Sequence, residues 1–94
     1  MTTIEAARHV VENGCSLMRP RKDTPHQWDV KEAFGGKKRG WFYMDAFTAS
    51  MLVGVYNALN GTPTMSAEAM REKFNRLPLM ALINLGWKHT KAAA

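Results

Sequence analysis

The feature that most constrains how this chain can fold is a run of residues without charge, AFTASMLVGVYNAL at positions 46–59. Its large apolar residues recur at helical spacing and form one stripe: Phe47, Met51, Leu52, Val55 and Leu59. The residues beside this stripe are mostly apolar too, and a helix that is apolar nearly all round is buried on several sides. The run therefore predicts a central, interior helix over residues 46–59. Asp45 precedes it as an N-cap, because a carboxylate there accepts hydrogen bonds from the first free amides.

A first helix is predicted over residues 3–13. Thr2, followed by Glu5 three positions later, is a capping-box pattern. Apolar residues then recur at helical spacing, namely Ile4, Ala7, Val10 and Val11. Gly14 ends the helix, because glycine readily adopts the left-handed conformation of a helix C-terminus.

Two more helices are predicted after the uncharged run. Ser66 caps a helix over residues 66–77, whose inward residues are Met70, Phe74 and Leu77. Pro78 begins the last helix, since proline is tolerated at the first helical position. We expect Gly86 to end this helix, with Trp87 folding back onto its last turn.

Alternating patterns between the first helix and the uncharged run predict three short strands. Residues 15–19, CSLMR, form the first strand, in which Cys15 is expected to be a small buried hydrophobe. Residues 27–34 form the second, with one face made of Trp28, Val30 and Phe34. Residues 41–44 form the third, and the glycine-rich GGKKRG before it predicts a β-hairpin with a basic tip.

Together these elements predict an α+β fold with the order α-β-β-β-α-α-α. A small three-stranded antiparallel sheet packs on about four helices, which cover its apolar side. Ninety-four residues suffice for one domain, so residues 1–94 are expected to form a single domain. Within it, residues 88–94 are expected to be a disordered tail.

The charge balance favours acidic partners. Thirteen Lys and Arg against eight Asp and Glu give a formal net charge of +5, which attracts nucleic acid, an anionic protein face or a membrane surface. The longest uncharged stretch falls short of the roughly 20 residues that a spanning helix needs, and the first residues do not form the apolar core of a signal peptide. Cys15 is the only cysteine, which excludes an intramolecular disulfide and fits a reducing compartment. We expect a soluble, cytoplasmic protein without a membrane partner.

Side chains suited to catalysis are few and scattered. The soft nucleophiles and bases are Cys15, His9, His26 and His89, and no pair of them has the spacing of a metal site. Cys15 also follows a helix end, whose negative dipole opposes a thiolate. GGKKRG lacks the Lys-Ser/Thr ending and the following helix of a phosphate-binding loop. The sequence therefore predicts a non-enzymatic protein without a metal or cofactor.

The candidate partner-binding residues are cations of two loops and the aromatic residues after the second loop: Arg19, Arg21, Lys22, Lys37, Lys38, Arg39, Trp41 and Tyr43. If the two aromatic residues are exposed, this set makes a stacking and electrostatic surface for single-stranded nucleic acid. In the alternative interpretation the aromatic residues belong to the core. The cations then only keep the hairpin soluble and blunt an edge strand.

A second candidate surface lies on the two C-terminal helices. The segment LMALINLGW at residues 79–87 has apolar positions on more than one side. Either both sides are buried against the sheet and the central helix, or one is left for a partner protein or for a second copy of the chain in a homodimer.

Residues 43–87 carry motifs that resemble small accessory proteins of tailed phages, especially those that infect mycobacteria and related actinobacteria. The shared motifs are a D-x-x-T-A-S helix start, a V-Y-x-A-L-N ending and an R-x-K-F-x-x-L-P turn before a helix with W-K. The matching positions are Asp45, Thr48, Ala49, Ser50, Val55, Tyr56, Ala58, Leu59, Asn60, Arg71, Lys73, Phe74, Leu77, Pro78, Trp87 and Lys88. This chain inserts GTPTMSAEAM between the helices. The resemblance implies expression in the cytoplasm of an infected bacterium.

These observations lead to two functional expectations. The first is a non-enzymatic phage accessory protein that binds a host bacterial protein or self-associates, and so modulates host machinery. The alternative is a small nucleic-acid-binding accessory protein that uses the basic hairpin tip and the flanking aromatic residues. Salt separates the two, because phosphate-driven binding weakens steeply as the salt concentration rises.

Overall fold

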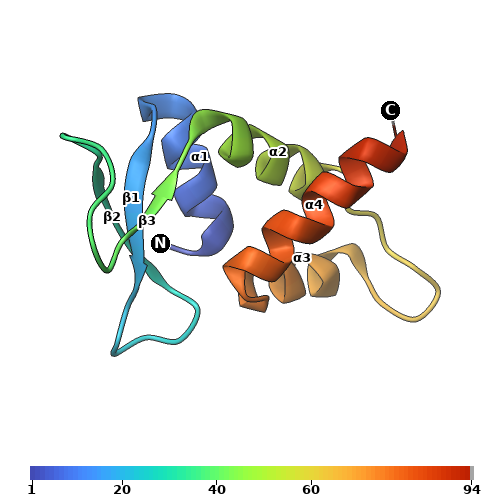
Figure 1. Ribbon diagram of the computed structural model, residues 1–94. Coiled ribbons are helices and arrows are strands. Elements are labelled where there is room, and N and C mark those ends of the chain that lie inside the picture. Colours follow the sequence, from blue (N-terminus) through green and yellow to red (C-terminus); the bar gives the residue numbers. More distant parts are fainter. Residues whose placement is uncertain (94) are drawn as a thin grey trace.

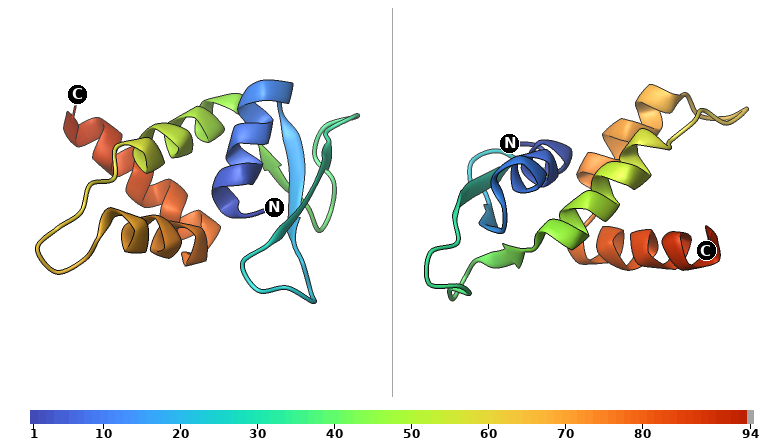
Figure 2. Two further views of the ribbon diagram at one scale, coloured as in Figure 1. Left: turned by 180° about the vertical axis from the view of Figure 1, so that it is seen from behind. Right: turned by 90° about the horizontal axis from the view of Figure 1, so that it is seen from above.

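The computed structural model describes residues 1–93, with side chains up to residue 90 (Figure 1). In order, the elements are α1 (Thr3–Asn13), β1 (Ser16–Pro20), β2 (Trp28–Glu32), β3 (Phe42–Met44), α2 (Ala46–Asn57), α3 (Ala67–Arg76) and α4 (Leu79–Ala93). The predicted α+β class and the order α-β-β-β-α-α-α are confirmed. α1 packs beside the sheet, and α2 leads away from it toward α3 and α4 (Figure 2).

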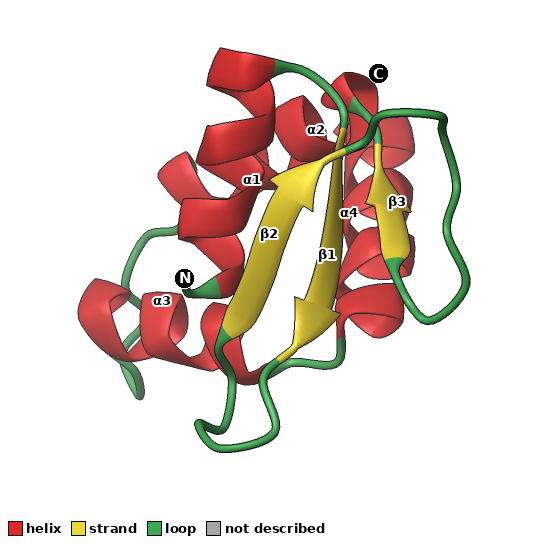
Figure 3. Cartoon of the chain, turned by 90° about the vertical axis from the view of Figure 1, so that its left-hand side faces the viewer, coloured by secondary structure: helices red, strands yellow, loops and turns green. Residues whose placement is uncertain are grey.

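β1 is the middle strand of the sheet and pairs antiparallel with both of its neighbours, in the order β2-β1-β3 (Figure 3). The predicted hairpin between the second and third strands is therefore wrong, because these strands pair with β1 and not with each other. Segment 33–41 instead passes the end of β1 and joins opposite edges of the sheet, which lie about 10 Å apart. β1 is central because Ser16, Leu17 and Met18 are all buried, and consecutive strand residues can be buried only where both faces are covered.

The two faces of the sheet have different surroundings. Met18, paired with Val30 and Phe42, lies on the inner face, which packs on the helices and contributes to the hydrophobic core. Leu17 is the next residue of β1, so its side chain points to the opposite, outer face. Figure 3 shows that this face of the sheet lies on the side away from the helices. Leu17 is nevertheless 1% exposed, so something other than a helix must cover it.

α1 begins and ends where its capping residues predict. The Thr2 hydroxyl accepts a hydrogen bond from the Glu5 amide at 3.3 Å, and the Glu5 carboxylate accepts one from the Thr2 amide at 2.8 Å. After the helix, the Gly14 amide donates to the Val10 carbonyl at 2.8 Å. Val11 is 47% exposed and not part of the buried stripe, because adjacent helical positions point about 100° apart.

A chain of hydrogen bonds joins β2, α1 and α3. The Trp28 indole donates to the Thr3 hydroxyl at 2.9 Å, and this hydroxyl donates to the Asn75 carbonyl at 3.4 Å. The Asn75 side chain in turn accepts a hydrogen bond from the Ile4 amide at 3.0 Å. These bonds satisfy the buried Thr3 and fix the start of α1 against the sheet, because an unsatisfied buried polar group would be destabilising.

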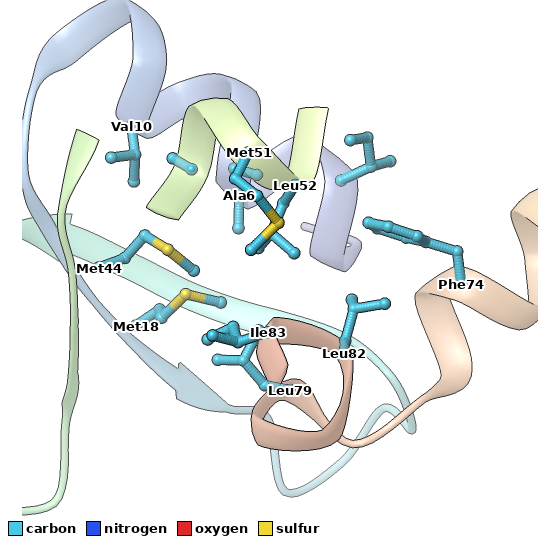
Figure 4. Close-up of a cluster of buried hydrophobic side chains, with 13 residues drawn as sticks. Ala6, Val10, Met18, Met44, Met51, Leu52, Phe74, Leu79, Leu82 and Ile83 are labelled. Atoms are coloured by element: carbon cyan, nitrogen blue, oxygen red, sulfur yellow. The ribbon is translucent and has the colours of Figure 1, made fainter. Parts of the chain in front are cut away.

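The hydrophobic core lies between the inner face of the sheet and the helices (Figure 4). It is built from all four helices and from β1 and β3, through Ile4, Ala6, Ala7, Val10, Met18, Met44, Ala49, Met51, Leu52, Phe74, Leu79, Leu82 and Ile83. Three of its larger members are methionines, whose flexible side chains fill irregular gaps between short elements.

α2 is less buried than the interior helix, buried on several sides, that the sequence predicted, because one of its sides is exposed. Ala49, Met51 and Leu52 are its buried residues, whereas Phe47, expected in the same stripe, is 82% exposed. α2 also ends at Asn57, two residues before the predicted end. Three short neighbours in a small chain do not surround a fourth helix completely. The N-cap prediction is confirmed, since the Asp45 carboxylate accepts a hydrogen bond from the Thr48 amide at 2.7 Å.

α3 follows its predicted start. The Ser66 hydroxyl accepts a hydrogen bond from the Ala69 amide at 3.1 Å. Phe74 is buried, and its ring meets the Tyr56 ring edge-on, with 5.2 Å between the centroids. The other two residues expected to point inward, Met70 and Leu77, are only half-buried.

α4 continues through Gly86 to Ala93, so the predicted helix end at Gly86 is wrong. A side chain at Gly86 would meet the end of the Met51 side chain. The glycine thus allows close packing of α4 on α2 instead of ending the helix. Trp87 continues the helix and does not fold back. Residues 88–93 of the expected tail are the last turns of α4, and residue 94 lies outside the described residues.

Candidate binding surfaces

Trp41 lies over the outer face of the sheet and contacts two cations. Lys31 Nζ is 4.1 Å and Arg19 Cζ is 4.3 Å from the centroid of the indole ring, within the range of cation–π contacts. Lys31 belongs to β2 and Trp41 directly precedes β3, so this contact spans β1. Leu17 lies between Lys31 and Tyr43 in the strand register. We conclude that the indole and the cations above the sheet cover Leu17.

Five cations gather around this indole and define what we name the basic surface: Arg19, Lys31, Lys37, Lys38 and Arg39. Burial, and then the nearby positive charge of Lys38, lower the pKa of Lys31 below its ordinary value. Within the described residues, the ion pairs closer than 4 Å involve Arg19 and Arg21, with Asp29 as the carboxylate next to this surface. The basic surface therefore keeps an excess of positive charge.

The first half of segment 33–41 is a tight turn with Phe34 at its corner. The Gly36 amide donates to the Ala33 carbonyl at 3.1 Å, and Gly35 has φ 78°, as the third position of a type II turn requires. Phe34 is 87% exposed. The prediction that Phe34 shares a face with the second strand is therefore wrong, because β2 ends before it at Glu32.

The second half of the segment is another tight turn, which leads into Trp41. The Trp41 amide donates to the Lys38 carbonyl at 3.1 Å, and Gly40 has φ 81°. Arg39 stands at the exposed corner of this turn. Residues 37–43 surround an open hollow of about 520 Å³.

Most of the predicted partner-binding residues come together at this place. Lys37, Lys38, Arg39, Trp41 and Tyr43 all line the hollow. The two aromatic residues are half-buried on the outer face, so they are neither core residues nor freely exposed.

The predicted cations at the end of β1 and in the loop after it have different surroundings. Arg19 reaches the basic surface through its contact with Trp41. Arg21 pairs with Asp23 at 3.2 Å and with Asp29 at 3.9 Å, and the Asp23 hydrogen bond raises the pKa of Arg21. Lys22 is exposed in the loop between β1 and β2 and does not line the hollow.

Cys15 is exposed, which corrects the prediction of a buried residue. β1 begins one residue later than expected, so Cys15 lies in the bend between α1 and β1. Hydrogen bonds from the Tyr43 hydroxyl and the Ala46 amide lower the pKa of the Cys15 thiol. The start of α2 therefore faces this sulfur, in addition to the end of α1 that the sequence indicated.

The helices carry a second, more apolar depression of similar volume, which we name the helical groove. It lies between α2, α3 and α4 and has a volume of about 510 Å³. Its lining comes from Val55, Ala58, Leu59, Asn60, Met65, Met70, Lys73, Phe74, Leu77, Leu82, Leu85, Gly86 and His89. Leu85 is 57% exposed and Met65 is 36% exposed. One apolar side of the last helix is therefore buried within the chain, whereas the other, which carries Leu85, is left partly exposed.

Sequence reasoning missed part of both surfaces. Lys31 is absent from the predicted partner-binding residues, and only the strand register places it across β1 from Trp41. Val55 and Leu59 were assigned to the core, although they line the helical groove. Since α2 is uncharged all round, its sequence does not distinguish a buried side from one that faces a groove.

The residues considered for catalysis remain dispersed. His9 lies on α1 beside Asn13, His26 is in the loop before β2, and His89 is on α4. Among residues 1–93, no three His, Cys, Asp or Glu side chains are close enough to hold a metal ion. In the same part of the chain, each helix is too short or too polar to cross a membrane.

Both surfaces are open to solvent. The basic surface offers positive charge beside aromatic rings, whereas the helical groove offers apolar contact area. Both arrangements suit binding. Comparison of the chain with models of known families, with curated proteins and with solved structures gives no significant match.

Proposed function

We propose that this chain is a non-enzymatic binding protein and that its helical groove takes up an amphipathic helix of a partner protein. The observation that carries this proposal is the apolar lining of an open groove, with Leu85 57% exposed on its wall. Small monomeric proteins rarely leave a continuous apolar depression open unless it binds something.

The shape and chemistry of the groove favour a helix as the occupant. Three helices form its walls, and a helix laid into such a groove inserts apolar residues at intervals of three and four. Lys73 and His89 stand among the lining residues. A partner helix with acidic residues beside its apolar stripe would therefore match both the groove and the positive charge at its edge.

The proposed source of the partner is a host bacterium. The resemblance of residues 43–87 to tailed-phage accessory proteins supports a role in the cytoplasm of an infected cell, where such a protein would modulate host machinery. Binding to a second copy of this chain is the competing use of the same groove.

The test compares two substitutions on α4. Leu85→Asp places a charge in the groove, while Met80→Asp changes a similarly exposed residue that lines a different hollow, beside Trp28 and Trp41. Wild type and both variants are used to capture proteins from nuclease-treated host lysate. The helical segment of a captured protein is then titrated by calorimetry.

We expect Leu85→Asp to weaken this affinity at least about tenfold, because a charge is desolvated in an apolar site, and Met80→Asp to leave it unchanged. Equal effects of the two substitutions would show that the groove is not the docking site. Sedimentation equilibrium completes the test. A dimer that Leu85→Asp dissociates would identify a second copy as the occupant and overturn the proposal of a foreign helix.

A further inference from the structure

The outer face of the sheet is a second surface with its own chemistry, on the side of the sheet away from the helices (Figure 3). Three properties of this face indicate what it binds: its charge, its aromatic side chains and the shape of segment 33–41. None of the three depends on the helical groove.

The cations of the basic surface lie close together, and nearby carboxylates neutralise only part of their charge. Lys31 and Arg19 approach the same indole ring at 4.1 and 4.3 Å, and Lys38 is near enough to Lys31 to disfavour its charged form. Asp29 contacts Arg19 at 3.6 Å but also Arg21 at 3.9 Å, so it is shared. A polyanion that contacts several of these cations at once would relieve their mutual repulsion.

Of the aromatic side chains, Trp41 stabilises the surface, whereas Phe34 is free to contact a ligand. Trp41 supports the surface, since it covers Leu17 and its ring is engaged by two cations. Phe34 is available, because it is 87% exposed at the corner of a turn that its neighbouring glycines allow. An exposed aromatic ring on the same segment as several cations suits the stacking of bases of single-stranded nucleic acid.

The shape of the surface favours a single strand over a duplex. Residues 33–41 form two consecutive tight turns rather than a helix or ribbon that could enter a major groove. The hollow of about 520 Å³ beside Lys37–Tyr43 is within the size range of small-ligand pockets. It could accept an unstacked nucleotide, whereas the bases of a duplex remain stacked and paired.

We propose that the outer face of the sheet binds single-stranded nucleic acid, with the cations of the basic surface on its phosphates and Phe34 stacked on a base. An acidic peptide would satisfy the charge, but it would leave the exposed phenyl ring without a flat partner. The protein would then bind nucleic acid on one side and a protein helix on the other.

The experiment measures fluorescence anisotropy of a fluorescein-labelled dT₁₅ strand between 50 and 200 mM salt. The charge variant combines Lys37→Ala, Lys38→Ala and Arg39→Ala. Its control combines Lys73→Ala, Arg76→Ala and Lys88→Ala, which removes the same charge from exposed positions on α3 and α4. Phe34→Ala tests stacking, and thermal melts followed by circular dichroism verify that each variant folds.

We expect the charge variant to reduce the slope of log K against log salt by about 2, since each phosphate contact on a single strand contributes roughly 0.7. The control variant should keep the slope of the wild type. Phe34→Ala should weaken binding about tenfold without changing the slope, because stacking releases no counterions.

Three results would overturn the proposal. The first is an absence of binding at 50 mM salt, and the second is an equal loss in the charge and control variants, which would reflect net charge alone. The third is tighter binding of a duplex of the same length, or of a poly-glutamate peptide used as a competitor. Leu85→Asp should leave the binding of single-stranded nucleic acid unchanged. Either proposal, that of the basic surface or that of the helical groove, can therefore be wrong without affecting the other.

Discussion

The basic surface and the helical groove are built in opposite ways. Most of the basic surface comes from one continuous segment, residues 37–43, whose turns present its side chains locally. The helical groove comes from three helices between residues 55 and 89 and exists only when they pack together. Binding at the first surface would depend on charge, which salt screens, and binding at the second would depend on apolar area, whose effect changes much less with salt.

The two surfaces also rest on different supports. Under the basic surface lies Leu17, which is sealed by Trp41 and separated from the main core by the sheet itself. Beside the helical groove, Gly86 lets α4 approach Met51 of α2 closely. Trp41 supports one surface with a large side chain, whereas Gly86 supports the other because its lack of a side chain allows two helices to pack closely. Substitutions of Leu17 and Gly86 test these two roles.

The largest expected effect is that of Leu17→Ala. Removing a buried Leu side chain costs about 2–5 kcal/mol of unfolding free energy, and we expect a value in this range because Leu17 is 1% exposed. Leu85→Ala, at a position 57% exposed, should stay within about 0.5 kcal/mol of wild type. Urea denaturation gives both values. Similar small losses in the two variants would mean that no buried layer exists beneath Trp41.

The next effect concerns the close packing beside the helical groove. Gly86→Leu should destabilise the protein by about 1–3 kcal/mol, because the new side chain meets the end of the buried Met51 side chain and overpacks the contact between α4 and α2. Gly54→Leu is the matched control in α2, where no atom lies within 4 Å of a new Cβ. There the gain in helix propensity should dominate, by up to about 1 kcal/mol. A stabilising Gly86→Leu would contradict the proposed role of Gly86.

A smaller effect is expected at the turn that leads into the basic surface. Gly40 has φ 81°, and a residue with a Cβ pays about 1–2 kcal/mol in the left-handed region. Gly40→Ala should therefore lower the unfolding free energy by roughly 1 kcal/mol, whereas Gly40→Asn should lose less, since asparagine tolerates this conformation. Equal losses for Ala and Asn would point to lost contacts instead of backbone strain.

The smallest effect is spectroscopic and concerns the edge of the basic surface. The Tyr43 hydroxyl and the Ala46 amide lower the pKa of the Cys15 thiol, so the thiolate forms at a lower pH than in an unfolded chain. Tyr43→Phe removes the larger of these contributions and should move the pKa upward. Thiolate absorbance at 240 nm, followed against pH, measures the shift. Tyr56→Phe serves as the control on α2 and should leave the titration of Cys15 unchanged.

Several parts of the fold follow from local sequence. The caps at Thr2, Asp45 and Ser66 begin their helices where predicted, because each depends on a side chain and an amide a few residues away. The basic segment and its aromatic neighbours were also located from sequence, since they are contiguous. Whether the basic surface or the helical groove binds as proposed remains a prediction for the experiments above.

Other parts depended on contacts between distant residues. The hairpin prediction failed because glycine-rich loops look alike whether they join paired strands or cross a third one. Gly86 resembled a helix end, but the position of Met51 gives it a different role. Phe47 belongs to an apolar stripe, yet its exposure depends on how far α1 and α4 reach along α2.

The amino-acid sequence by itself determined the class of fold, the order of elements, the helix starts and the basic segment. These properties depend on interactions between residues close together in the chain, which act before the chain is compact. The tertiary structure alone decided the strand order, the two sides of α2 and the surroundings of Trp41. These depend on which apolar faces meet, and several pairings of such faces satisfy one sequence pattern until close packing selects one.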